Sequence, residues 1–280
     1  ARFLNGPGAR FASLCQSMDE LRHAQTEIHT LSHYNKYFGG MHDWAKMSDR
    51  VWYLSVPKSF FDDAGTAGPF EWLIAIGFSF EYLLTNLLFV PFMSGASFNG
   101  DLPTMTFGFS AQSDESRHIS NGYATLLMAL SDEGNHQLLE RDLRYAWWNN
   151  HRVVDAAIGT FIEYGTKDRR KDRESYAEMW RRWIYDDYYR SYLVPLEKYG
   201  LTIPHDLVEE AWNRITNKGY VHEVARFFAT GWPVNYWRID TMTDTDFEWF
   251  EEKYPGWYSK YGKWWENYNR LSTPNGHHPI

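Results

Sequence analysis

A five-residue pattern, Asp-Glu-x-Arg-His, occurs twice in the sequence and combines residue types that bind metal ions. The first copy is Asp19–His23 and the second is Asp114–His118. In each copy the glutamate and the histidine are three residues apart, so both side chains lie on one face of an α-helix. Two such helices facing each other would offer two carboxylates and two imidazoles to a pair of metal ions. The alternative is that the copies are capping or ion-pair clusters on two surface helices.

A third carboxylate, Glu81, lies at the centre of the most apolar segment of the chain, from Trp72 to Phe92. This segment is long enough to cross a membrane, but a charged side chain at mid-bilayer is expensive. A carboxylate buried in protein is also costly unless it meets a cation or binds a proton. We therefore expect no membrane span but a buried helix, on which Glu81 binds the same metal ions as the repeated motifs.

Carboxylate and imidazole ligands suit iron or manganese better than structural zinc, which prefers a closed tetrahedral site with thiolates. The pattern is similar to ferritin-like di-iron proteins, where two helices each supply one Glu and two others each supply Glu-x-x-His. By that template five of six ligands are present: Glu20, His23, Glu81, Glu115 and His118. The sixth, a glutamate, is expected on a helix upstream of Ala1.

The acidic residues that begin the two motifs, Asp19 and Asp114, are expected beside the metal ligands rather than among them. A carboxylate in that position accepts the ring N–H of a ligating histidine and fixes its tautomer. Arg22 and Arg117 would neutralise these aspartates or lie on a docking surface.

Hydrophobic periodicity predicts helices throughout the chain, and no long stretch alternates with period two. Pro91 is expected to stop the helix that carries Glu81, since proline disfavours helical conformation in the residue before it. Loops are expected over residues 62–69 and 94–103. Helices are expected over residues 9–37, 71–90, 104–130, 136–148, 151–164, 176–199, 207–218, 220–230 and 244–253.

The expected fold class is therefore all-α, a ferritin-like di-iron helical bundle with additional C-terminal helices. We interpret residues 1–280 as one helical domain, in which 1–130 form the di-iron part of the bundle and 131–280 pack on it. Both ends look cut within elements, which suggests a fragment of a longer subunit. The net charge of −8 without a basic patch disfavours nucleic acid as a partner, and the single cysteine, Cys15, fits a reducing cytoplasmic compartment.

Several segments resemble the large (α) hydroxylase subunit of soluble di-iron monooxygenases. The phenol hydroxylase and propane monooxygenase branch is most similar to residues 19–25, 51–61, 79–92 and 107–118. A different branch, of propane and methane monooxygenase type, is most similar to residues 121–123, 147–151, 183–187 and 254–258. The changeover falls near Asp114–His118, a motif that both branches share. A natural intermediate and a recombinant of the two branches would each produce this pattern.

The resemblance implies an oxygenase component that hydroxylates a small apolar substrate, such as phenol or propane, with O₂ and electrons from NADH. It implies two iron ions in this subunit, and FAD and iron–sulfur groups only in a separate reductase. It also implies β and γ subunits in an (αβγ)₂ assembly, together with a regulatory protein. The alternatives are a di-iron ferroxidase, a ribonucleotide reductase-like subunit or a metal-free scaffold paralogue.

The resemblance further assigns roles around the metals. Thr85 matches a threonine that assists O₂ activation, and Asn86 matches a residue of an access pore. Phe60, Phe80 and Phe89 match the walls of a substrate pocket. From the residues alone, the Thr85 hydroxyl would equally well bond to the main-chain carbonyl four residues earlier, and the three phenylalanines would be ordinary core.

Overall fold

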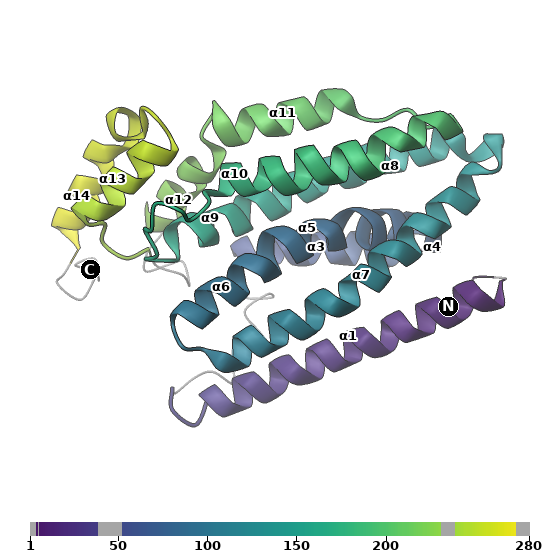
Figure 1. Ribbon diagram of the computed structural model, residues 1–280, viewed down its shortest axis with the longest axis horizontal. Coiled ribbons are helices and arrows are strands. Elements are labelled where there is room, and N and C mark those ends of the chain that lie inside the picture. The colour runs from purple at the N-terminus through teal and green to yellow at the C-terminus, as the bar shows by residue number, and fades with distance from the viewer. Residues whose placement is uncertain (1–3, 5, 39–51, 231–238, 273–280) are drawn as a thin grey trace.

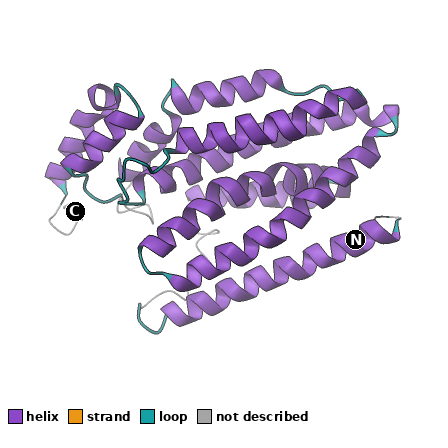
Figure 2. Ribbon diagram, viewed as in Figure 1, coloured by secondary structure: helices purple, strands orange, loops and turns teal. Residues whose placement is uncertain are grey.

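The computed structural model describes residues 4, 6–38, 52–230 and 239–272, and its regular elements within these ranges are all helical (Figures 1 and 2). The expected all-α class is confirmed. The first helix, α1 (Pro7–Tyr34), begins directly after Gly6, with Pro7 at a position where proline is tolerated. It ends at Tyr34, three residues before the end predicted at residue 37.

The helix that carries Glu81 is longer than predicted and runs without a break from Pro69 to Phe98. It alternates between α-helical and wider π-helical turns: α4 (Pro69–Trp72), η2 (Leu73–Phe80), α5 (Glu81–Leu83), η3 (Leu84–Phe89) and α6 (Val90–Phe98). The prediction that Pro91 stops the helix is wrong. Proline breaks an α-helix because it clashes with the carbonyl four residues earlier. Here the turn before it is π-helical, with the Val90 N–H bonded to the Thr85 carbonyl, so the backbone there is wider.

The two loops predicted over residues 62–69 and 94–103 are both shorter than expected. Helix α3 (Trp52–Thr66) continues through most of 62–69, and only residues 99–101 separate α6 from α7 (Leu102–Leu130). Asp101 caps α7, because its carboxylate accepts a hydrogen bond from the Thr104 backbone N–H at 3.1 Å. The motifs of the proposed site therefore lie on three long helices, α1, the segment Pro69–Phe98 and α7.

The helical segment Pro69–Phe98 meets the length and composition criteria for a membrane span, and 72% of its apolar window is buried inside the fold. It packs against α7 on one side and α8 (His136–Asn150) on another, as expected for a core helix. Helix α1 lies along the outer side of α7, where Figure 1 shows the two running side by side.

Two helices of the core come close together at a pair of glycines. A Cβ atom on Gly122 of α7 would lie 2.6 Å from the backbone carbon of Gly77 in η2. Gly122 is four residues after His118, and Gly77 is four residues before Glu81. The contact thus sets the distance between two proposed ligands one helical turn away.

The chain after α7 forms a second group of helices, and every helix predicted there is confirmed to within two residues at its ends. The last helical segment, η8 (Tyr258–Gly262) and α14 (Lys263–Leu271), was not predicted. The remaining elements are η4 (Glu133–Asn135), η5 (His151–Asp155), α9 (Ala156–Tyr164), α10 (Tyr176–Trp180), η6 (Arg181–Leu193), η7 (Val194–Tyr199), α11 (His205–Thr216), α12 (Tyr220–Thr230) and α13 (Asp244–Lys253).

Candidate metal centre

Three glutamates and one histidine meet where α1, α5 and α7 come together. Glu20, Glu81, Glu115 and His118 each offer one ligand atom, and these four atoms lie within 4.8 Å of one another. Glu81, Glu115 and His118 are almost fully buried, whereas the Glu20 side chain is 49% exposed. Three helices distant in sequence thus converge on one small, buried polar volume.

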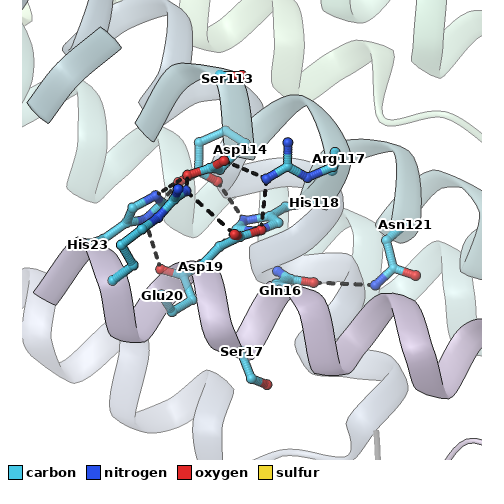
Figure 3. Close-up of polar contacts among 12 residues, drawn as sticks. Gln16, Ser17, Asp19, Glu20, His23, Ser113, Asp114, Arg117, His118 and Asn121 are labelled. Atoms are coloured by element: carbon cyan, nitrogen blue, oxygen red, sulfur yellow. Dashed lines mark hydrogen bonds and ion pairs between the residues drawn. The ribbon is translucent and has the colours of Figure 1, made fainter. Parts of the chain in front are cut away.

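The two repeated motifs face each other and exchange contacts across α1 and α7 (Figure 3). His23 Nε2 lies 2.9 Å from Oδ2 of Asp114, and His118 Nε2 lies 3.3 Å from Oδ2 of Asp19. Each aspartate therefore serves the histidine of the other motif, a pairing that the sequence did not reveal. With Nε2 held in this way, Nδ1 of each histidine is left to face the glutamates.

The Nδ1 atoms point into the cluster. His118 Nδ1 is 3.0 Å from Glu115 and 3.3 Å from Glu20, while His23 Nδ1 is 3.5 Å from Glu20 and 3.8 Å from Glu115. His23 Nδ1 is thus about half an ångström farther from the two carboxylates than His118 Nδ1, but it faces the same two carboxylates. All five residues predicted as ligands are brought together.

Two arginines close the outer side of the centre. The Arg117 guanidinium donates to Asp19 at 3.1 Å and also to Asp114, and Arg22 donates to Asp114. Burial alone would raise the pKa of Asp19, but hydrogen bonds from Arg117 and His118 outweigh it and hold the pKa below its ordinary value. The aspartates therefore remain charged acceptors for the imidazoles.

Protons compensate the negative charge of the cluster in the metal-free protein. Burial, with the nearby Glu115 carboxylate, raises the pKa of Glu81 to about 8. Burial would lower the pKa of His118, but hydrogen bonds to Glu115 and Glu20 raise it to about 10. The cluster thus holds a proton on both residues at neutral pH. A cation that replaced these protons would satisfy the same carboxylates, so the donor set fits metal binding with proton release.

The Glu81 carboxylate has two different environments. Its Oε1 accepts a hydrogen bond from Gln16 Nε2 at 2.8 Å, while its buried Oε2 makes no hydrogen bond within the described residues. An unsatisfied buried carboxylate oxygen is costly unless a cation meets it. Sequence reasoning missed Gln16, although its place four residues before Glu20 puts it on the same helix face.

The two residues one turn beyond Glu81 are both buried and differ in their contacts. The Thr85 hydroxyl makes no hydrogen bond within the described residues, so the back-bond considered as an alternative does not form. The Asn86 side-chain amide donates to the main-chain carbonyl of Tyr82 at 3.0 Å. Thr85 therefore keeps a free hydroxyl on the segment that carries Glu81, whereas Asn86 bonds to its own helix.

The three predicted pocket phenylalanines occupy two places. Phe60 and Phe80 lie 5.8 Å apart between ring centroids, and Phe60 also borders a cavity of about 330 Å³ beside α8. Phe89 contacts Phe107 at 5.9 Å, and Phe107 contacts the ring of His23 at 6.1 Å. Only the ring of Phe89 is connected in this way to the candidate metal centre.

The comparisons with known proteins agree with this geometry. Residues 1–133 match the protein family described as methane, phenol and alkene hydroxylase. The large subunit of the hydroxylase component of propane 2-monooxygenase from Mycolicibacterium smegmatis is 81% identical over 200 residues, which are 71% of this chain and 37% of that protein. The oxygenase component of phenol 2-monooxygenase from Pseudomonas sp. strain CF600 is 42% identical over 271 residues, covering 93% of this chain and 49% of that protein.

A solved structure supports the same relationship. The crystal structure of phenol hydroxylase from Pseudomonas sp. OX1 superposes with a TM-score of 0.83 at 39% sequence identity, over 99% of this chain and 55% of that one. The resemblance inferred from the sequence is therefore confirmed. The chain spans about half of the length of these relatives, or less.

Proposed function

We propose that this chain, a relative of the methane, phenol and alkene hydroxylases, is part of the large subunit of a multicomponent di-iron monooxygenase. The observation that carries the proposal is the convergence of Glu20, Glu81, Glu115 and His118 within 4.8 Å, with His23 facing the same carboxylates. Carboxylates with imidazoles from a helical bundle are the donor set of di-iron carboxylate proteins.

Bound iron would supply the activation of O₂ for the insertion of one oxygen atom into a substrate. The residues of this chain would bind the iron and orient its ligands. Glu20, Glu81 and Glu115 would provide oxygen ligands, and His23 and His118 would ligate through Nδ1, the nitrogen that faces the glutamates. Asp19 and Asp114 would hold the opposite ring nitrogens and so fix both tautomers.

The apolar walls around the centre suit a small uncharged substrate, such as phenol or propane. Phe89 and Phe107 would exclude water on the side of His23, and Phe60 and Phe80 would line a neighbouring apolar region. The Thr85 hydroxyl, which has no partner among the described residues, would move a proton near the metals. Asn86 would control access to the centre, and to do so its side chain would have to break its hydrogen bond to the Tyr82 carbonyl.

A sixth ligand completes the proposal. Glu20 is half exposed, and the cavity of about 850 Å³ that borders it is lined by Gln16, Leu21 and Trp72 among others. We place the missing glutamate on a further helix on this side, about thirty residues before Glu20 in the full-length sequence, a spacing inferred from the resemblance. An upstream sequence without such a glutamate would contradict the di-iron assignment.

The complete enzyme would be cytoplasmic and would need partners. We propose β and γ subunits in an (αβγ)₂ assembly, a regulatory protein, and a reductase that carries FAD and an iron–sulfur cluster and takes electrons from NADH.

The test is to purify the full-length large subunit with its partners, measure its iron content, and follow substrate-dependent consumption of NADH and O₂. About two irons per large subunit and a hydroxylated product are expected. Oxidation and storage of iron without a hydroxylated product would favour a ferroxidase. A ribonucleotide reductase-like subunit would also give no hydroxylated product. Less than about one iron per chain would favour a metal-free scaffold.

A further inference from the structure

A chain of two amide side chains connects the Glu81 carboxylate to α7. Asn121 Nδ2 donates to Gln16 Oε1 at 3.3 Å, and Gln16 Nε2 donates to Glu81 Oε1 at 2.8 Å. Gln16 is 4% exposed, and Figure 3 shows it and Asn121 facing each other between α1 and α7. The three residues come from three different helical segments.

Only one arrangement of donors and acceptors satisfies both of these hydrogen bonds. With the proton of the metal-free carboxyl on Oε2, and equally when Glu81 is ionised, Oε1 can only accept, so Gln16 must present its NH₂ group to it. The Gln16 oxygen then faces α7, where the NH₂ group of Asn121 donates to it. Turning the Gln16 amide over would place oxygen against oxygen and nitrogen against nitrogen at the two contacts. Asn121 thus sets the orientation of Gln16, and Gln16 in turn holds Glu81.

The hydrogen bond engages one specific oxygen of Glu81. Oε1 is held by Gln16 and lies 3.7 Å from His118 Nδ1, whereas Oε2 makes no hydrogen bond within the described residues. With one oxygen anchored, the carboxylate cannot rotate freely about its terminal bond. It is therefore set in one orientation before any metal arrives.

We propose that Gln16, oriented by Asn121, is a positioning residue that fixes the Glu81 carboxylate for metal binding. The inference rests on the metal centre of the proposed function. Ligands that are held in place by outer hydrogen bonds bind metal more tightly, and loss of such a partner typically costs about 10- to 100-fold in affinity. Because Gln16 is a neutral donor, we expect its loss to cost about tenfold, at the lower end of that range.

The experiment is an anaerobic titration of the full-length subunit, in its complex, with Fe²⁺, and with Co²⁺ as a spectroscopic probe. Gln16→Met keeps the length of the side chain and removes the donor, and it is expected to weaken metal binding about tenfold and to change the Co²⁺ visible absorption spectrum. Gln25→Met is the matched control, since Gln25 is an exposed glutamine on the same helix. It should bind Co²⁺ with the wild-type affinity and spectrum.

A second variant tests the orientation step without touching Gln16. Asn121→Asp replaces a donor by an acceptor, so that the Gln16 NH₂ group turns towards α7 and its oxygen turns towards Glu81. Asn121 is only partly buried, so this variant should fold, and it should reproduce the weakened binding of Gln16→Met. Ser120→Asp, an exposed neighbour, is the control for added charge.

The outcomes separate this inference from the proposed function. A wild-type complex that binds no Fe²⁺ or Co²⁺ contradicts the proposed function itself. A wild type that binds metal, with Gln16→Met and Asn121→Asp unchanged in affinity and spectrum, overturns the positioning role. Weakened binding in Gln16→Met together with normal binding in Asn121→Asp overturns the part assigned to Asn121.

Discussion

Replacement of Gly122 by alanine tests whether the crossing of α7 and η2 positions the candidate metal centre. The added Cβ would lie 2.6 Å from the carbonyl carbon of Gly77, 2.8 Å from its oxygen and 2.8 Å from the nitrogen of Phe78. All three atoms are backbone, so no side chain can turn away to make room. The two helices must therefore separate.

The magnitude follows from two opposing effects. Overpacking of a core typically costs 1–3 kcal/mol, and a clash with backbone belongs at about 3 kcal/mol. Alanine regains about 1 kcal/mol over glycine in a helix interior. Gly122→Ala should therefore lower the free energy of unfolding by about 2 kcal/mol. It should also weaken metal binding, because His118 lies one turn away and moves with α7.

Two other glycines provide matched controls. Gly77 faces Gly122, yet its own added Cβ would be 3.7 Å from the nearest atom, an ordinary contact, and Gly95 in α6 has nothing within 4 Å. Gly95→Ala should raise the free energy of unfolding by up to about 1 kcal/mol, and Gly77→Ala should leave it unchanged or raise it slightly. All three variants can be compared by urea unfolding followed by tryptophan fluorescence, and by Fe²⁺ titration. A Gly122→Ala variant as stable as Gly95→Ala would refute the reasoning, as would a Gly77→Ala variant that is equally damaging.

Three further predictions concern titratable groups. Asp114 accepts a hydrogen bond from His23 at 2.9 Å, and Asp19 accepts one from His118 at 3.3 Å. Asp114→Asn should therefore weaken Fe²⁺ binding more than Asp19→Asn does, and each loss of affinity should be about 10- to 100-fold. Equal losses in the two variants would contradict this ranking. In the metal-free protein, burial raises the pKa of Glu81, so its contribution to stability is present below pH 4.5 and is lost as pH rises through about 8. Metal-free Glu81→Gln should therefore gain stability over the wild type at pH 8 but not at pH 4, and should lose metal binding; a gain that is independent of pH would argue against this cause. Burial lowers the pKa of His222, which bonds to the Tyr164 hydroxyl at 2.8 Å, to about 3. The unfolded chain binds a proton near pH 6.5 and the folded chain does not, so stability should fall by about 2 kcal/mol from pH 7 to pH 5. His222→Gln should flatten that slope in urea unfolding, and an unchanged slope would assign it to other groups.

The sequence by itself determined the fold class, most helix positions and the five candidate ligands. This was possible because helix periodicity is local, and because Glu-x-x-His places two donors on one face wherever a helix forms. A carboxylate in an apolar helix signals a buried charge that needs a partner, so Glu81 was also identifiable without a structure.

The tertiary structure decided which partner each residue has. Asp19 contacts His118 rather than the histidine of its own motif, because α1 and α7 pack against each other and exchange side chains. The course of the chain past Pro91 depended on π-helical turns, which buried packing stabilises and which periodicity does not encode. Gln16 and Asn121 were missed for the same reason. A hydrogen bond between residues 105 positions apart exists only after the helices have packed, and no local pattern specifies it.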